Sequence, residues 1–145
     1  MTNKEIMNKS SLNQPICPWL LAGDWLLIAL FVFIGQRDHD MAIIASLPSF
    51  FTTTLALALP WTLVAWLMGA LRSPRWAELW PWLGRVAAAW LIASPLGLIL
   101  RAWSRQQGSI AVPFMLVTLG LGVLSMLAWR ALAYWWAKRK VAPAS

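Results

Sequence analysis

Four long apolar runs dominate the sequence, and the short segments between them hold most of the charged residues. A helix needs about 20 apolar residues to cross the hydrocarbon core of a bilayer. Charged residues make up 12% of this chain, whereas soluble proteins have about 25%. We therefore predict an all-α, polytopic membrane protein in which four transmembrane helices form a bundle. The predicted spans are residues 19–36, 48–70, 85–101 and 110–130.

The ends of the chain lie outside these runs and are polar or basic. We expect residues 1–14 to form a flexible cytoplasmic tail, residues 15–137 the transmembrane domain and residues 138–145 a basic cytoplasmic tail. Pro48 lies inside the second run, where a proline disfavours an uninterrupted helix. We therefore expect a short interfacial helix over residues 40–47, capped by Asp40, before the second span begins.

Twelve tryptophans are distributed between the runs and the links. Indole rings favour the headgroup level of a bilayer, because they combine an apolar body with a polar N–H. We expect Trp76, Trp80 and Trp82 to lie at that level in the link over residues 71–84. Four tryptophans within the runs are expected to fill space between helices, namely Trp25, Trp61, Trp66 and Trp90.

The distribution of lysine and arginine predicts the orientation of the bundle. With four spans, the two tails and the link over residues 71–85 share one side. That side carries nine of the twelve basic residues, and cytoplasmic segments hold such an excess. We therefore expect both termini in the cytoplasm. The nine are Lys4, Lys9, Arg72, Arg75, Arg85, Arg130, Lys138, Arg139 and Lys140, and the other three are Arg37, Arg101 and Arg105.

The first span contains a carboxylate, Asp24, about five residues from its start. A charged side chain at the bilayer centre costs roughly 3 kcal/mol, so Asp24 is expected to have a basic partner. Arg85 and Arg130 lie at the same predicted level. The pair either fixes helix packing or serves as a proton- or cation-linked site. The face of the first span that points into the bundle is predicted to comprise Asp24, Ile28, Phe31, Gly35 and Asp38.

A second polar group is predicted at the opposite end of the bundle. It comprises Arg37, Asp38, His39 and Asp40, level with Arg101 and Arg105. His39 is the sole histidine, so a proton relay, a metal ligand, an anion site and a polar cap on the bundle are all open. Because transition metals take several histidine or cysteine ligands, we predict no metal and no other cofactor. The two outer arginines either bind an anion or lipid headgroup or simply anchor the helix.

Small residues recur at helical spacing in three of the predicted spans. Such residues let membrane helices approach closely, so they are predicted to form packing seams. The seam residues are Ala58, Thr62, Ala65 and Gly69, then Gly97, and then Thr118, Gly122 and Ser125.

The order of these features resembles a family of small bacterial and archaeal membrane proteins, domain of unknown function 3054. The resemblance covers about residues 20–131. It rests on Asp24, the run from Phe31 to His39, Pro60-Trp61 with Trp66, Gly97 with Arg101, Gly108 with Phe114, and Trp129-Arg130. The resemblance implies a four-helix protein of a prokaryotic plasma membrane and implies no established activity.

Three functions are compatible with the sequence. The first is a non-enzymatic structural, assembly or oligomeric component whose partners are the lipid bilayer and its own copies or another membrane protein. The second is a small protein for ion or solute permeation that uses the two charged layers. The third is a lipid-modifying membrane enzyme with His39 as its base. The net charge of +7 does not indicate nucleic-acid binding, because the basic residues lie between apolar runs.

Overall fold

The computed structural model describes residues 16–37, 43–74, 78–104 and 112–140. It contains four helices: α2 (Pro18–Arg37), α3 (Ile43–Leu67), α4 (Leu79–Ser104) and α5 (Val112–Arg139). Each helix is long and apolar enough to cross a membrane. The described segments contain no strand, only an isolated bridge between Ile16 and Arg72. The predicted all-α, four-helix membrane architecture is therefore confirmed.

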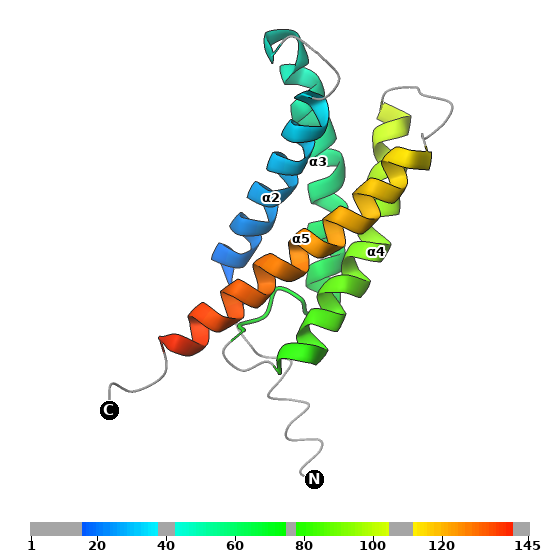
Figure 1. The fold of residues 1–145 in the computed structure, drawn as a ribbon. Helices are drawn as coiled ribbons and strands as arrows, with labels where there is room; N and C mark the ends of the chain where they lie inside the picture. Colours follow the sequence, from blue (N-terminus) through cyan, green and yellow to red (C-terminus); the bar gives the residue numbers. More distant parts are fainter. Residues whose placement is uncertain (1–15, 38–42, 75–77, 105–111, 141–145) are drawn as a thin grey trace.

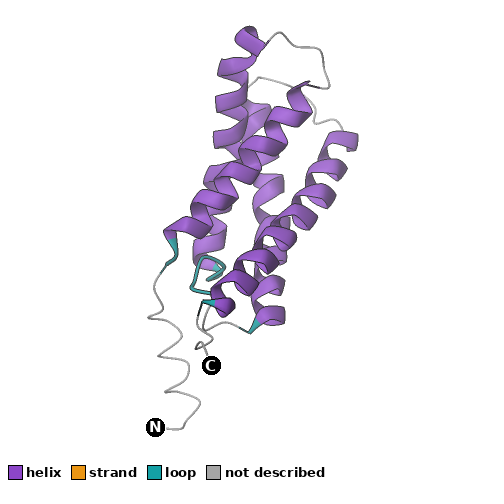
Figure 2. Cartoon of the chain, turned by 60° about the vertical axis from the view of Figure 1, so that its left-hand side comes forward, coloured by secondary structure: helices purple, strands orange, loops and turns teal. Residues whose placement is uncertain are grey.

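The four helices form a closed ring (Figures 1 and 2). Helices that follow one another in the chain lie side by side, and α5 closes the ring against α2. The turn after α3 lies beside the start of α2, where the Cys17 amide donates to the Leu71 carbonyl oxygen at 3.0 Å. The end of α5 reaches the same place, since the rings of Trp19 and Trp136 are 5.8 Å apart. The two described ends of the chain therefore share one end of the bundle.

Helices α3 and α4 begin earlier than the sequence predicts, and α5 continues to Arg139, beyond the predicted end of its span at residue 130. Helix α3 continues through Pro48, so the separate interfacial helix predicted over residues 40–47 was wrong. In hydrocarbon a helix satisfies nearly all backbone groups, and losing one proline N–H is less costly than ending the helix. Helix α4 begins at Leu79 rather than at residue 85, because the tryptophan-rich link contributes its own helical turn.

Helix α3 ends in a glycine-dependent turn. Gly69 has a φ of 68°, in the left-handed region that glycine adopts without strain. The Gly69 amide donates to the Trp66 carbonyl oxygen at 3.1 Å, and the Ala70 amide donates to Ala65 at 2.8 Å. This pair of bonds is a Schellman motif. Gly69 therefore terminates the helix, which corrects its assignment to a packing seam within the span.

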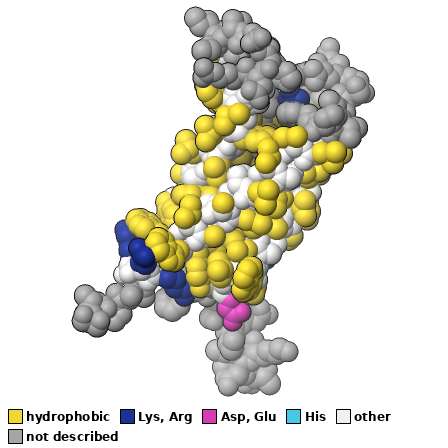
Figure 3. All heavy atoms as spheres, in the orientation of Figure 1, with side chains coloured by type: hydrophobic (Ala, Val, Ile, Leu, Met, Phe, Trp, Pro, Cys, Tyr) yellow, Lys and Arg dark blue, Asp and Glu magenta, His cyan; other side chains and the backbone are white. Residues whose placement is uncertain are grey.

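The inward face of α2 is made of Leu20, Asp24, Ile28 and Val32, which are all buried. The predicted face was correct for Asp24 and Ile28, but Gly35 is exposed. The outward faces carry large hydrophobic side chains, which are spread over the middle of the face shown in Figure 3. Such a surface is suited to lipid.

The tryptophans within the spans divide between the core and the surface. Trp61 and Trp90 are buried, as predicted. Trp25 is half-buried and donates its indole N–H to the Thr62 hydroxyl at 2.9 Å. Trp66 is 54% exposed, so the prediction that it fills space between helices was wrong. Of the link tryptophans, Trp80 is exposed, whereas Trp82 is fully buried among the helices. Trp76 lies outside the described residues.

Helices α3 and α4 meet at Gly97. A Cβ atom at this position would lie 2.8 Å from the Ala56 carbonyl oxygen. Pro60, four residues after Ala56, has no N–H to donate to that oxygen. The freed carbonyl therefore faces the α carbon of a glycine, where a weak Cα–H···O contact can replace part of the lost bond. Ala58 and Ala65 are buried on the same helix.

Helix α5 has two glycines with opposite surroundings. A Cβ atom on Gly122 would lie 2.4 Å from the Trp90 ring, whereas a Cβ atom on Gly120 would meet nothing within 4 Å. Trp90 also donates its indole N–H to the Thr118 carbonyl oxygen at 3.3 Å. The α4–α5 contact therefore depends on Gly122 being a glycine.

We expect Gly122→Ala to destabilise the fold by about 1–3 kcal/mol, because the added methyl group overlaps the Trp90 ring. Gly120→Ala is the matched control and should be neutral or stabilise by up to about 1 kcal/mol through helix propensity. Reversible unfolding of the purified protein in mixed micelles measures both changes. Equal effects of the two variants would contradict the packing described at Gly122.

Candidate functional site

The candidate site is a pair of opposite charges inside the ring of helices. Asp24 on α2 and Arg130 on α5 are both 0% exposed, and Arg130 Nη2 forms an ion pair with Asp24 Oδ2. A charge inside a membrane is stable only with a partner or with water. The structure therefore joins the first helix directly to the last through Arg130.

Each charged group has further hydrogen bonds from other elements. Asp24 Oδ2 accepts the indole N–H of Trp61, on α3, at 3.1 Å. Arg130 Nη1 donates to the Ala70 carbonyl oxygen at 2.8 Å. Trp82, on α4, donates to the same oxygen at 3.1 Å. The Trp82 ring centre lies 5.3 Å from Arg130 Cζ, a cation–π contact. The pair is thus held by all four helices and by the turn after α3.

The local fold explains why these groups converge. The Schellman motif at Gly69 reverses the chain and places Ala70, which is fully buried, at the end of the bundle interior. Because α4 starts early, Trp82 is part of this helix and lies on the same face as Val86 and Trp90. This position places the Trp82 ring against Arg130. Trp90 contacts Trp61 edge-on, with ring centres 5.5 Å apart.

Some polar atoms at the site lack a hydrogen bond of good geometry among the described residues. These buried atoms are Asp24 Oδ1, Arg130 Nε and Trp129 Nε1. The Trp129 indole lies against Gly23, where a Cβ atom would lie 2.1 Å from the ring. The Trp129 indole also acts as a weak donor toward the Asp24 carboxyl group, so Arg130 Nε is the clearly unused donor next to the ion pair. Such an arrangement can bind a proton, a water molecule or one small polar group.

Three further buried hydroxyl groups lie in the bundle. The hydroxyl oxygens of Thr118, Ser94 and Thr54 are buried and have no partner in the described part of the chain. Arg101 lies near the far end of α4, and its Nε donates to the Thr53 hydroxyl at 3.4 Å. Trp61 and Trp90 stand between Asp24 and Thr118 in this chain of contacts.

The remaining predicted site residues have different positions. Arg85 is half-buried on α4, and its Nε has no hydrogen-bond partner, so the structure does not join it to Asp24. Asp38, His39, Asp40 and Arg105 lie outside the described residues, as does the side chain of Arg37. At that end, Gln36 on α2 donates to the Ser49 hydroxyl on α3 at 3.1 Å. No three metal-ligating side chains come together within the described segments.

Sequence reasoning missed Trp61, Trp82 and the Ala70 carbonyl as partners of the charged pair. Trp82 precedes Val86 and Trp90 by four and eight residues, and this spacing is a signal that α4 begins early. The contribution of Ala70 has no such signal, because a backbone oxygen is exposed by the turn geometry and not by the side chain. Gly23 was also missed, although it directly precedes Asp24.

We expect Asp24→Asn and Arg130→Gln each to destabilise the protein by about 3–5 kcal/mol, because each leaves one buried charge without its partner. The double variant should be clearly more stable than the sum of the single effects predicts. Reversible unfolding in mixed micelles provides this double-mutant cycle. Arg101→Gln is a control with a smaller effect, since Arg101 is only half-buried. Additive single effects would show that the pair is not coupled.

Comparisons with known proteins agree with this architecture. Residues 21–133 match the family described as protein of unknown function (DUF3054). The matched region begins at Leu21 and ends at Ala133, so it includes both charged residues and all the contacts between them. No curated protein and no solved structure matches the chain. The chain therefore belongs to the DUF3054 family of proteins of unknown function.

Proposed function

We propose that the protein is a non-enzymatic component of the membrane that associates with its own copies or with another membrane protein. The proposal is supported by the contacts of the buried polar residues and glycines, which are made within the chain. Asp24 and Arg130 form an ion pair with one another. Gly23, Gly97 and Gly122 each pack closely against another helix of the same chain. The interior is therefore occupied by contacts that hold the fold, which leaves the outer faces for association.

Gly120 is the observation that carries this proposal. It lies in the middle of α5, is exposed and has nothing within 4 Å of the position of a Cβ atom. A glycine in a helix costs about 1 kcal/mol relative to alanine, and here no contact within the chain compensates for it. Outward glycines let membrane helices approach closely. Val117, Leu121 and Leu124 flank it as exposed apolar side chains.

Self-association can be measured separately from folding. We expect donor- and acceptor-labelled copies in liposomes to show energy transfer that falls on dilution with lipid. Gly120→Leu should weaken association about tenfold, equivalent to roughly 1.4 kcal/mol, without lowering stability. Leu26→Ala, at an exposed leucine on α2, is the control for a change in exposed apolar area and should leave association unchanged. Absence of energy transfer for the wild-type chain at all lipid ratios would rule out association with its own copies.

The orientation and location belong to the same proposal. Nine basic residues against three support both termini lying in the cytoplasm, with the protein in the prokaryotic plasma membrane. In this orientation the Asp24–Arg130 pair lies near the cytoplasmic surface, because the two spans that hold it have their cytoplasmic ends at Pro18 and Arg139.

Permeation of a proton or small ion is the second candidate. It is favoured by the unpaired Asp24 Oδ1 and by the buried hydroxyls of Thr118 and Ser94. Proteoliposomes containing the purified chain and an internal pH dye test this function. Under this candidate, Asp24→Asn should abolish a proton flux that Thr52→Ala, a change at an exposed hydroxyl, leaves intact. A flux unchanged in Asp24→Asn would contradict any role for the carboxylate.

A further inference from the structure

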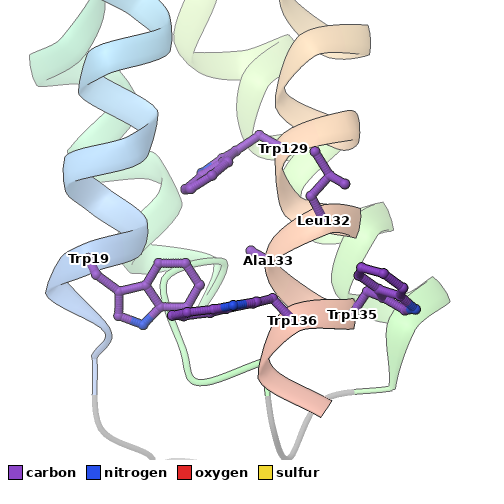
Figure 4. Close-up of a pocket in the computed structure, with 6 residues that line it drawn as sticks. All are labelled: Trp19, Trp129, Leu132, Ala133, Trp135 and Trp136. Carbon is purple, nitrogen blue, oxygen red and sulfur yellow. The ribbon is translucent and has the colours of Figure 1, made fainter. Parts of the chain in front are cut away.

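A concave pocket lies between the start of α2 and the end of α5. It has a volume of about 410 Å³, within the range of small-molecule binding pockets. Figure 4 shows Trp19 and Trp136 at one end of the pocket and Trp129 at the other. The lining side chains are all apolar, namely Trp19, Trp129, Leu132, Ala133, Trp135 and Trp136.

The tryptophans that form this pocket support one another. The Trp19 ring contacts Trp129 edge-on at 6.0 Å and Trp136 at 5.8 Å between ring centres. Trp129 in turn lies against Gly23. Because Trp19 comes from α2 and the other rings from α5, the shape of the pocket depends on the closure of the ring of helices.

The position of the pocket determines what can fill it. Its lining residues lie within the apolar spans Pro18–Gln36 and Met115–Arg139. At this level of a membrane the surrounding medium is lipid acyl chain near the headgroup region. An acyl chain therefore has the chemistry and the access to occupy the pocket.

Two basic side chains lie against two of the tryptophan rings that line the pocket. Arg139 Cζ lies 3.3 Å from the centre of the Trp135 ring. Lys140 Nζ lies 3.8 Å from the centre of the Trp136 ring. Both side chains are exposed, and within the described segments neither is in an ion pair. Arginine and lysine bind phosphate oxygens, and each cation near a membrane surface favours anionic lipid.

We propose that this pocket is a specific site for an anionic phospholipid. One acyl chain lies among Trp19, Trp129 and Leu132, and the phosphate contacts Arg139 and Lys140. The occupant carries both an apolar chain and a negative charge, which matches an apolar pocket with a cationic edge. This site is independent of self-association, because the pocket is complete within one chain.

Native mass spectrometry of the full chain tests the proposal. The protein is released from neutral detergent containing equal amounts of phosphatidylglycerol and phosphatidylcholine with identical acyl chains. We expect the wild-type chain to retain one phosphatidylglycerol in preference to phosphatidylcholine. Each cation should contribute about fivefold to the preference, so Arg139→Gln with Lys140→Gln should nearly abolish it. Equal retention of the two lipids by the wild-type chain would overturn the proposal.

A matched pair of variants separates the pocket from the general lipid-facing surface. Leu132→Trp fills the pocket, whereas Leu124→Trp adds the same ring elsewhere on α5. The two leucines are similarly exposed, at 62% and 64%. Retention of phosphatidylglycerol should fall at least fivefold in Leu132→Trp and stay unchanged in Leu124→Trp. Equal retention of phosphatidylglycerol in both variants would show that lipid binds only to the general lipid-facing surface. If Leu132→Trp does not fold, the exposed Arg139 and Lys140 changes still decide the outcome.

Discussion

The ion pair between Asp24 and Arg130 is the interaction on which the rest of the bundle depends. Lipid solvates apolar helices as well as other helices do, so burial of apolar area does not by itself drive their association. A buried charge pair does, because each charge needs the other and further hydrogen bonds. Trp61 of α3 and the Ala70 carbonyl in the turn after α3 supply those bonds, and the Trp82 ring of α4 contacts Arg130. The pair is therefore complete only when all four helices are in register.

Large rings and glycines complement one another around this pair. The Trp90 ring occupies the space left by Gly122, and the Trp129 ring occupies the space left by Gly23. Each ring is rigid and carries one donor, so it fills volume and fixes an orientation at the same time. This pairing sets the distance between helices on either side of the charged residues. Gly23 and Gly122 are thus used for packing inside the chain, whereas Gly120, like Gly35 and Gly84, faces outward.

The sequence was sufficient to predict the four helices, the burial of Asp24 and its two alternative partners, because apolar run length and intramembrane charge are strong signals. It was not sufficient to choose between Arg85 and Arg130. That choice depends on the rotation of α4 and α5, which is decided by the turn at Gly69 and by the early start of α4. The burial of Trp82 was not predicted for the same reason, since a tryptophan in a link and one in a first helical turn have the same local sequence. The pocket beside Trp19 could not be predicted, because its two sides come from opposite ends of the chain.

The contacts of the Asp24–Arg130 pair also limit how Asp24 can take up a proton. Arg130 is fixed by the Ala70 carbonyl and by the Trp82 ring as well as by Asp24. Neutralising the carboxylate would leave a guanidinium buried without an opposite charge, a state that costs several kcal/mol. A proton taken up at Asp24 would therefore have to be accompanied by a movement of α5 that exposes Arg130 to water. The start of α2 and the end of α5 also form the pocket with its cationic edge, so any such movement would alter the lipid site at the same time. Helix α5 thus carries both Arg130 and most of the residues that line the pocket.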